Sequence, residues 1–220
     1  DAAPAEAPAG APAANASAGG AAAAAAAGGV DELPARAAAC LKHFVAYSAA
    51  QSGLDRTPVA VPERQLLNYF VPPFAKAIDA GALTVMEGYH ELNDVPVVAS
   101  EALLQTLLRE RLGFRGVLVT DWAEIKNLHA YHKVARSDED AVLMSINSTS
   151  VDMSMVPTDN TFPRYLADLV RDGRIPEERV DLSAARILQL KKTLGLLSNP
   201  VPPLDLPFVA TVGSAADRAA

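Results

Sequence analysis

The chain has little cysteine, few aromatic side chains and no excess of positive charge. Its 220 residues include a single cysteine, Cys40, and a single tryptophan, Trp122. One cysteine excludes an internal disulfide framework and a cysteine-rich zinc module. The formal net charge is −7. Because an acidic chain is repelled by the phosphate backbone of DNA or RNA, we expect no nucleic-acid partner.

Long apolar runs and nucleotide-binding motifs are also missing. Outside an alanine tract, no stretch reaches the roughly 18 apolar residues that a membrane-spanning helix needs. The sequence has no dinucleotide-binding glycine fingerprint, no phosphate-binding loop and no Gly-x-Ser-x-Gly elbow. We therefore predict no membrane span and no cofactor. The cellular compartment is left open.

Composition divides the chain into three parts. Residues 1–35 are mostly alanine, glycine and proline, so they cannot bury enough apolar surface to offset the entropy lost on ordering. We expect this segment to be disordered. Residues 36–198 have the hydrophobic patterning of a folded domain. Pro200 opens a proline-rich linker over 199–220, which we expect to lead toward a further, C-terminal domain.

Short apolar segments alternate with longer amphipathic ones in residues 36–198. The pattern predicts strands at 38–44, 83–87, 116–120 and 150–153, and helices at 63–80 (interrupted at Pro72-Pro73), 100–113, 137–146, 162–172 and 181–194. The strand at 116–120 is apolar throughout, which is typical of a parallel strand buried on both faces. This alternation indicates βαβ units. A complete (β/α)₈ barrel takes about 250 residues, so the fold is either a small doubly wound sheet or half of a barrel.

Reactive side chains follow each predicted strand. They are Lys42 and His43, Glu87 and Tyr89, Asp121 and Trp122, and Asp152. In parallel α/β folds, ligands bind at the carboxyl ends of the strands. Each carboxylate taken singly is better explained by a helix cap, but the four strand ends together favour a site.

These residue types suit the recognition of a sugar. A carboxylate such as Asp121 can attack an anomeric carbon, and a neighbouring lysine ammonium group stabilises its charged form and donates to hydroxyls. The indole of Trp122 offers a flat apolar wall to a sugar ring. The pattern therefore indicates a polyol-binding site with a nucleophilic carboxylate.

Several motifs resemble glycoside hydrolase family 3. The run from Leu107 to Trp122, LLRERLGFRGVLVTDW, resembles the active-site signature of that family, in which the aspartate is the nucleophile. The strand end Lys42-His43-Phe44 is similar to the one whose lysine and histidine hold sugar hydroxyls. The segment from Val85 to Pro96 resembles the next strand and loop, where a tyrosine lies near the nucleophile. Segments 151–155 and 179–196 follow in the order of the family.

The resemblance covers about residues 38–198 and is nearest to the β-glucosidase and exoglucanase branch. It implies an α/β fold of the TIM-type (β/α) barrel, with only the second half of the barrel in this chain. It also implies retaining hydrolysis of O-glycosyl bonds in a β-glucoside or related oligosaccharide, with Asp121 as nucleophile. Lys42, His43, Tyr89 and Trp122 would bind the substrate, with no metal ion. The unpaired edges of half a barrel predict self-association.

The chain departs from the family pattern at several positions. Asp94 replaces the usual glycine of the turn, and Glu124 stands where the family usually has a small residue. The loop after Phe44 lacks the Pro-Gly-His-Gly of the hexosaminidase branch. In the glucosidase branch, the glutamate acid/base belongs to a second domain. Glu87 and Glu91 are the only nearby carboxylates that could replace it, and neither matches a catalytic position.

Other residues keep a structural interpretation. We expect Asp152 to hold the end of its strand, and Arg56 to line the rim of the site or to form a surface ion pair. Two histidines in register lack a third ligand, so no zinc site is predicted for His129 and His132 with His90. A non-catalytic half-barrel or a sugar-binding remnant remains the alternative to an enzyme.

Overall fold

The computed structural model describes residues 37–156, 158–201 and 211–219. Its centre is a sheet of four parallel strands, namely β1 (Cys40–Phe44), β2 (Thr84–Glu87), β5 (Val117–Trp122) and β6 (Met153–Met155). The disorder expected for residues 1–35 concerns residues outside the described part, as does part of the linker expected at 199–220.

The strands are arranged in the order β1-β2-β5-β6, which is also their order along the chain. Each new parallel strand is therefore added on the same side of the preceding one. A doubly wound sheet instead reverses its direction at a switch point. Of the two alternatives that the sequence left open, the structure selects a segment of a barrel.

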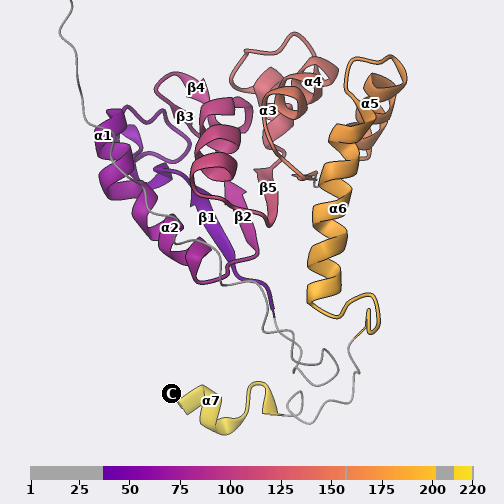
Figure 1. Cartoon of the computed structure of the whole chain (residues 1–220). Coiled ribbons are helices and arrows are strands. Elements are labelled where there is room, and N and C mark those ends of the chain that lie inside the picture. The colour runs from indigo at the N-terminus through magenta and orange to yellow at the C-terminus, as the bar shows by residue number, and fades with distance from the viewer. Residues whose placement is uncertain (1–36, 157, 202–210, 220) are drawn as a thin grey trace, which may run out of the picture. The chain divides into compact units, whose positions relative to one another are not determined.

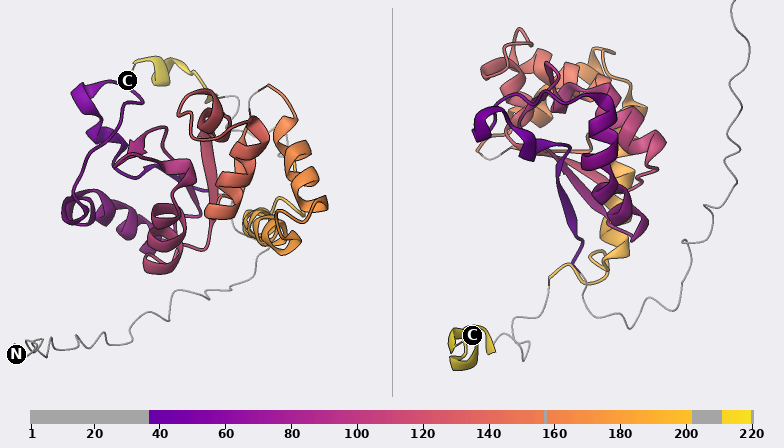
Figure 2. Two further views of the ribbon diagram at one scale, coloured as in Figure 1. Left: turned by 90° about the horizontal axis from the view of Figure 1, so that it is seen from above. Right: turned by 90° about the vertical axis from the view of Figure 1, so that its left-hand side faces the viewer.

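Helices follow the strands, as the alternation predicted. Strand β1 is followed by α1 (Glu63–Gln65), a π-type segment (Leu66–Phe70) and α2 (Val71–Asp79), and β2 is followed by the π-type helix η5 (Ala102–Arg111). Strand β5 is followed by α3 (Glu124–Ala130) and α4 (Asp138–Ser148). Strand β6 is followed by α5 (Thr161–Arg171) and α6 (Glu177–Thr193). Figures 1 and 2 show them succeeding one another in chain order alongside the sheet. A short helix, α7 (Ala215–Ala219), follows further along the chain. No helix in the described part is long and apolar enough to span a bilayer.

Four details differ from the predicted elements. Helix α3 and a hairpin of β3 (Glu91–Leu92) and β4 (Val95–Pro96) were not predicted. Pro72 and Pro73 do not interrupt their helix, because they lie in the first turn of α2, where a missing N–H is harmless. The last strand begins at Met153, because the preceding aspartate side chain occupies the N–H of Leu118.

The core lies between the sheet and the helices. Strand β5 is buried from Val117 to Asp121, which confirms the prediction of a strand covered on both faces. The largest fully buried apolar side chains are those of Phe44, Phe114, Leu104, Leu108, Leu118, Leu128, Leu169 and Ile175. They come from strands, helices and the loops that join them, so the sheet segment and its helices share one core.

The carboxylate of Asp152 holds three elements together from a fully buried position. Its Oδ2 accepts hydrogen bonds from the Leu118 N–H at 2.9 Å and from Arg109 at 2.7 Å. Its Oδ1 accepts from Arg186 at 2.8 Å and from Ser183 at 2.9 Å. Strand β5, η5 and α6 are thereby tied to one side chain, and the structural role predicted for Asp152 is confirmed.

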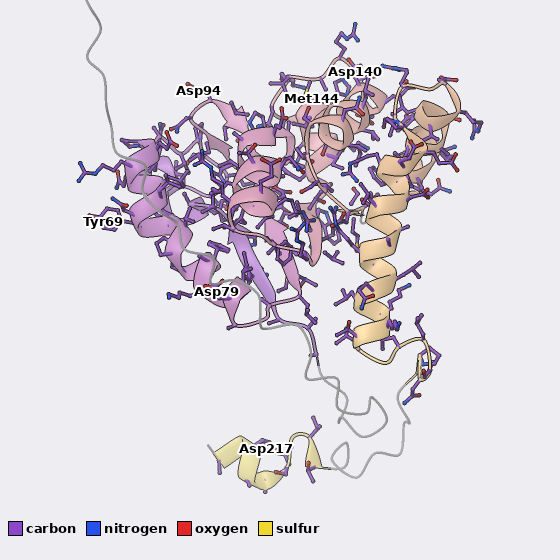
Figure 3. All side chains as sticks on the ribbon, in the orientation of Figure 1. Tyr69, Asp79, Asp94, Asp140, Met144 and Asp217 are labelled. Carbon is purple, nitrogen blue, oxygen red and sulfur yellow. The ribbon has the colours of Figure 1, made fainter. Side chains whose placement is uncertain are left out.

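The β3–β4 hairpin closes without the glycine that the family usually has there. Its two loop residues, Asn93 and Asp94, have φ angles of 51° and 68°. Positive φ at both positions is the type I′ turn, which asparagine and aspartate tolerate. The Asn93 amide also bonds to both the N–H and the C=O of Val61, at 2.9 Å each. Figure 3 shows Asp94, a residue of this turn, near the top of the view, whereas Asp79, the last residue of α2, lies much lower.

We predict that Asp152→Asn lowers the free energy of unfolding by about 3–5 kcal/mol, because it leaves the buried Arg109 without its counter-charge. Urea denaturation measures the change. The matched control is Asp168→Asn, which breaks an exposed pair with Arg171 and should cost at most about 1 kcal/mol. Equal losses in the two variants would contradict the role assigned to Asp152.

Candidate active site

The carboxyl ends of three neighbouring strands bring the predicted site residues to one edge of the sheet. His43 lies near the end of β1, Glu87 ends β2, and Asp121 is the penultimate residue of β5. The parallel register sets their level, since Phe44 pairs with Glu87 and Met86 pairs with Val119. The chain runs through this edge with cis peptide bonds at Lys42–His43 and Phe44–Val45.

Asp121 presents a largely enclosed carboxylate with partners on several sides. Its Oδ2 lies 3.2 Å from Nε2 of His43, and its Oδ1 accepts the Trp122 N–H at 2.7 Å. The hydroxyl of Tyr89 also hydrogen-bonds to it. The carboxylate does not cap the following helix, because α3 begins after Ala123 and has no side-chain cap. The structural alternative considered for Asp121 is therefore not what is observed.

Tyr89 is held as a neutral hydrogen-bond donor. Burial, the hydrogen bond to Asp121 and the negative charge of Asp121 raise its pKa to about 12. The guanidinium of Arg56 stacks over its ring, 3.9 Å from the centroid. Arg56 also lies 3.7 Å from Asp55, so it both lines the rim and forms a surface ion pair. Asp55 in turn accepts a short hydrogen bond from Tyr47.

The structure does not join all the predicted residues to Asp121. Lys42 is an exposed residue in the middle of β1 and makes no ion pair with any described carboxylate. Trp122 contributes its backbone N–H to Asp121, whereas the residue is 53% exposed. His43 and Tyr89 therefore contact the carboxylate, and the side chains of Lys42 and Trp122 are exposed to solvent.

Glu87 lies directly behind Asp121 and has no exposed surface. Its Oε1 accepts the backbone N–H of Asp121 at 2.9 Å, while its Oε2 has no partner among the described residues. Burial, and then the charges of Glu124 and Asp121, raise the pKa of Glu87 well above its ordinary value. Burial thus favours the neutral form of Glu87, whose Oε1 holds the backbone of Asp121, and the same burial keeps it from a leaving group.

A cluster formed by His132, Glu124 and Glu91 lies beside Glu87, and the sequence did not predict that these three side chains meet. Nε2 of His132 lies 2.8 Å from Oε1 of Glu124, and its Nδ1 lies 2.8 Å from Oε1 of Glu91. Burial opposes the charged ring, but the two hydrogen bonds outweigh it, and the pKa of His132 is raised. Burial also raises the pKa of Glu124, although its bonds to His132 and Asn127 oppose this.

One sequence signal pointed to this group. Glu124 differs from the small residue that is usual directly after the Asp121 motif, and a carboxylate at such a position needs a buried partner. The partner itself, His132, was considered only as a metal ligand. His129 instead contacts Asp138 at 2.8 Å. The described residues include no group of three or more side chains suited to holding a metal ion.

His90 is engaged separately from the other histidines. Its Nε2 lies 2.9 Å from the carbonyl oxygen of Val45, and its ring is fully buried. Burial lowers its pKa to about 4, so the ring is neutral at physiological pH. This contact ties the segment after β2 to the segment after β1, close to the site.

Comparison with known proteins finds one family. Residues 15–190 match the Glycosyl hydrolase family 3 N terminal domain. A lysosomal beta glucosidase of Dictyostelium discoideum is 47% identical over 188 residues, which are 84% of this chain and 23% of that protein. A periplasmic beta-glucosidase of Salmonella typhimurium is 34% identical over 160 residues, which are 73% of this chain and 20% of that protein.

A solved structure agrees with the fold. A beta-glucosidase from Listeria innocua in complex with glucose superposes with a TM-score of 0.70 and 33% identity, covering 74% of this chain and 22% of that one. The barrel class and the family resemblance are thereby confirmed. The chain spans between a fifth and a quarter of the length of these relatives.

We predict that Glu87→Gln changes the pH dependence of stability. Between its ordinary pKa and the raised one, Glu87 holds a proton in the folded state that it loses on unfolding. Its contribution to stability is therefore lost as the pH rises, by up to about 1.4 kcal/mol per pH unit. Glutamine has no such dependence, so the free energy of unfolding of the variant increases relative to that of the natural protein as the pH rises above the ordinary carboxyl pKa.

Urea denaturation at several pH values measures this trend in the free energy of unfolding. The matched control is Glu101→Gln, at an exposed position at the start of η5. A difference between the Glu87 variant and the natural protein that stays constant with pH would show that Glu87 is charged in the folded state.

Proposed function

Since the chain belongs to glycosyl hydrolase family 3, we propose that its protein hydrolyses β-glucosidic bonds with retention of configuration and that Asp121 is the nucleophile. The observation that carries the proposal is the carboxylate of Asp121 at the strand ends, contacted by His43 and Tyr89 and open to the rim where Trp122 lies. The names of the relatives, which are beta-glucosidases, supply the substrate class.

In the first step, an oxygen of Asp121 attacks the anomeric carbon and the bond to the leaving-group oxygen breaks. A covalent glycosyl-enzyme forms, and water then hydrolyses it to regenerate the carboxylate. Tyr89 donates a hydrogen bond to Asp121 and steadies its orientation, which favours attack along one direction.

The other rim residues bind the sugar in this proposal. His43 lies within reach of both the nucleophile and a bound ring, and exposed Lys42 is free to donate to hydroxyls. The exposed indole of Trp122 offers an apolar face to the sugar or to its leaving group. Lys42 and His43 come from β1, and Trp122 is the last residue of β5, with β2 lying between these two strands.

The proton donor for the leaving group is not among the carboxyls beside Asp121. Glu87 and Glu124 are buried, and Glu91 is engaged with His132. We propose that the acid/base belongs to a part of the protein outside this chain, because the relatives are four to five times as long as the matched segment.

The nucleophile is tested by trapping the covalent intermediate in the protein expressed from its complete gene. A 2-deoxy-2-fluoro-β-glucoside with a good leaving group should label the peptide that contains Asp121, as read by mass spectrometry. Asp121→Asn should abolish labelling, whereas the control Asp168→Asn, at an exposed helix position, should not. Labelling at Glu87 or Asp152 would overturn the assignment, and binding without turnover would favour a sugar-binding remnant.

We also predict that the 220-residue chain alone does not cleave disaccharides efficiently. General acid catalysis is worth about 10²–10⁴-fold, and it matters least for a nitrophenolate leaving group. Residual activity should therefore appear on nitrophenyl glucosides, and it should vanish in Asp121→Asn. Gel filtration of the same sample tests self-association through the outer strands β1 and β6. Brisk disaccharide cleavage would place an acid/base within the chain, with Glu91 the first residue to replace.

A further inference from the structure

His132 connects the two segments that carry Asp121 and Tyr89. Glu124 is the first residue of α3, three residues after Asp121, and Glu91 is the first residue of β3, two residues after Tyr89. Each carboxylate lies 2.8 Å from one ring nitrogen of His132. The imidazole therefore spans the turn after β5 and the hairpin after β2 with two short hydrogen bonds.

The surroundings make this bridge rigid. The side chains of His132 and Glu124 are each 1% exposed, so water does not compete for the hydrogen bond between them. The second oxygen of Glu124 accepts from the Asn127 amide at 2.6 Å, which fixes the carboxylate within α3. The backbone N–H of His132 also donates to the Asn127 carbonyl oxygen at 2.8 Å, which anchors the ring at the end of the same helix.

The residue next to His132 extends the connection to the rim. The hydroxyl of Tyr131 lies 3.5 Å from the carbonyl oxygen of Arg56, whose guanidinium stacks on Tyr89. Residues 131–132 thus contact three segments. These are the start of α3 after Asp121, the start of β3 after Tyr89, and the loop that carries Arg56.

We propose that His132 is a positioning residue, which holds Asp121 and Tyr89 in register by bonding to Glu124 and Glu91 at the same time. The inference rests on the proposed function, because it concerns the geometry of the nucleophile. His132 does not touch a substrate in this scheme, and it acts only through the two segments that it joins.

While both carboxylates are ionised, the bridge requires the charged ring. An imidazolium donates from both nitrogens, whereas a neutral imidazole donates from only one. The pKa of His132 is raised above 6.5 by its two carboxylates. The doubly bonded bridge is therefore complete below that ordinary value and is lost as the pH rises through the raised pKa.

Several other charged groups lie around the ring. The groups that face His132 or its partners are Glu124 of α3, Glu91 of β3, Glu87 at the end of β2, His90 after it, and Arg56 of the rim loop. Burial raises the pKa of Glu87 and lowers that of His90 to about 4. Of the two buried histidines, only His132 has a raised pKa, so a change of ring charge above the ordinary histidine pKa belongs to His132.

The test uses the protein expressed from its complete gene and a 2,4-dinitrophenyl β-glucoside. This leaving group needs no proton, so kcat/KM reports the attack of Asp121 without the titration of the acid/base. The natural protein should lose roughly tenfold in kcat/KM as the pH rises through the pKa of His132. His132→Gln, which cannot titrate, should show a reduced kcat/KM with no such inflection.

Two further variants keep the test decisive. His129→Gln is the matched control, because His129 also bonds to a carboxylate at 2.8 Å but does so toward Asp138 and away from the site. Its profile should equal that of the natural protein. Glu91→Gln removes one negative partner at a partly exposed position, so it should move the basic inflection to lower pH. This variant serves if His132→Gln does not fold.

The outcomes separate this inference from the proposed function. A protein that cleaves no glucoside, or that is labelled elsewhere than Asp121, overturns the proposed function and this inference with it. An active protein labelled at Asp121 whose His132 variant keeps the natural profile overturns this inference alone. The same holds if Glu91→Gln leaves the basic inflection where it was.

Discussion

The buried carboxylate of Asp152 is the interaction on which the arrangement of the sheet and its helices depends. It holds the N–H of Leu118 in β5 and at the same time neutralises Arg109 of η5 and Arg186 of α6. An uncompensated charge at this depth would be costly, so the helices must stay where their guanidinium groups reach it. Because this bond is made at Leu118, three residues before Asp121 in β5, it also fixes the position of the Asp121 carboxylate relative to the sheet.

Environment divides the carboxyls of this region into different roles. The side chain of Asp121 is 11% exposed and lies against donors, whereas Glu87, one strand away, is fully enclosed and has its pKa raised by burial. Glu124 is as deeply buried as Glu87 but has the charged partner His132. Of the two buried carboxyls behind Asp121, Glu124 is therefore paired with an imidazole, and Glu87 is driven toward its neutral form by burial.

Local patterns predicted the elements best where one residue type decides the outcome. Ser137 caps α4 by accepting the Asp140 N–H, as its position indicated, and the continuous apolar run of β5 is buried on both faces. Local patterns failed where a distant partner decides. Helix α3 carries the buried Glu124, which only a contact with His132 makes acceptable, and β6 starts late because of a side-chain bond to β5. The hairpin at Asn93 and Asp94 depends on the contact with Val61.

The sequence by itself determined the alternation of strands and helices, the family, and the residue types that follow each strand, because these depend on local composition and on short motifs. It could not decide between a doubly wound sheet and a barrel segment, since strand order is a property of non-local pairing. Only the tertiary structure decided which polar residues meet. It placed His43 and Tyr89 on Asp121 and left Lys42 exposed. It also joined Glu91, His132 and Glu124, because residues far apart in the chain become neighbours only when the sheet and its helices pack.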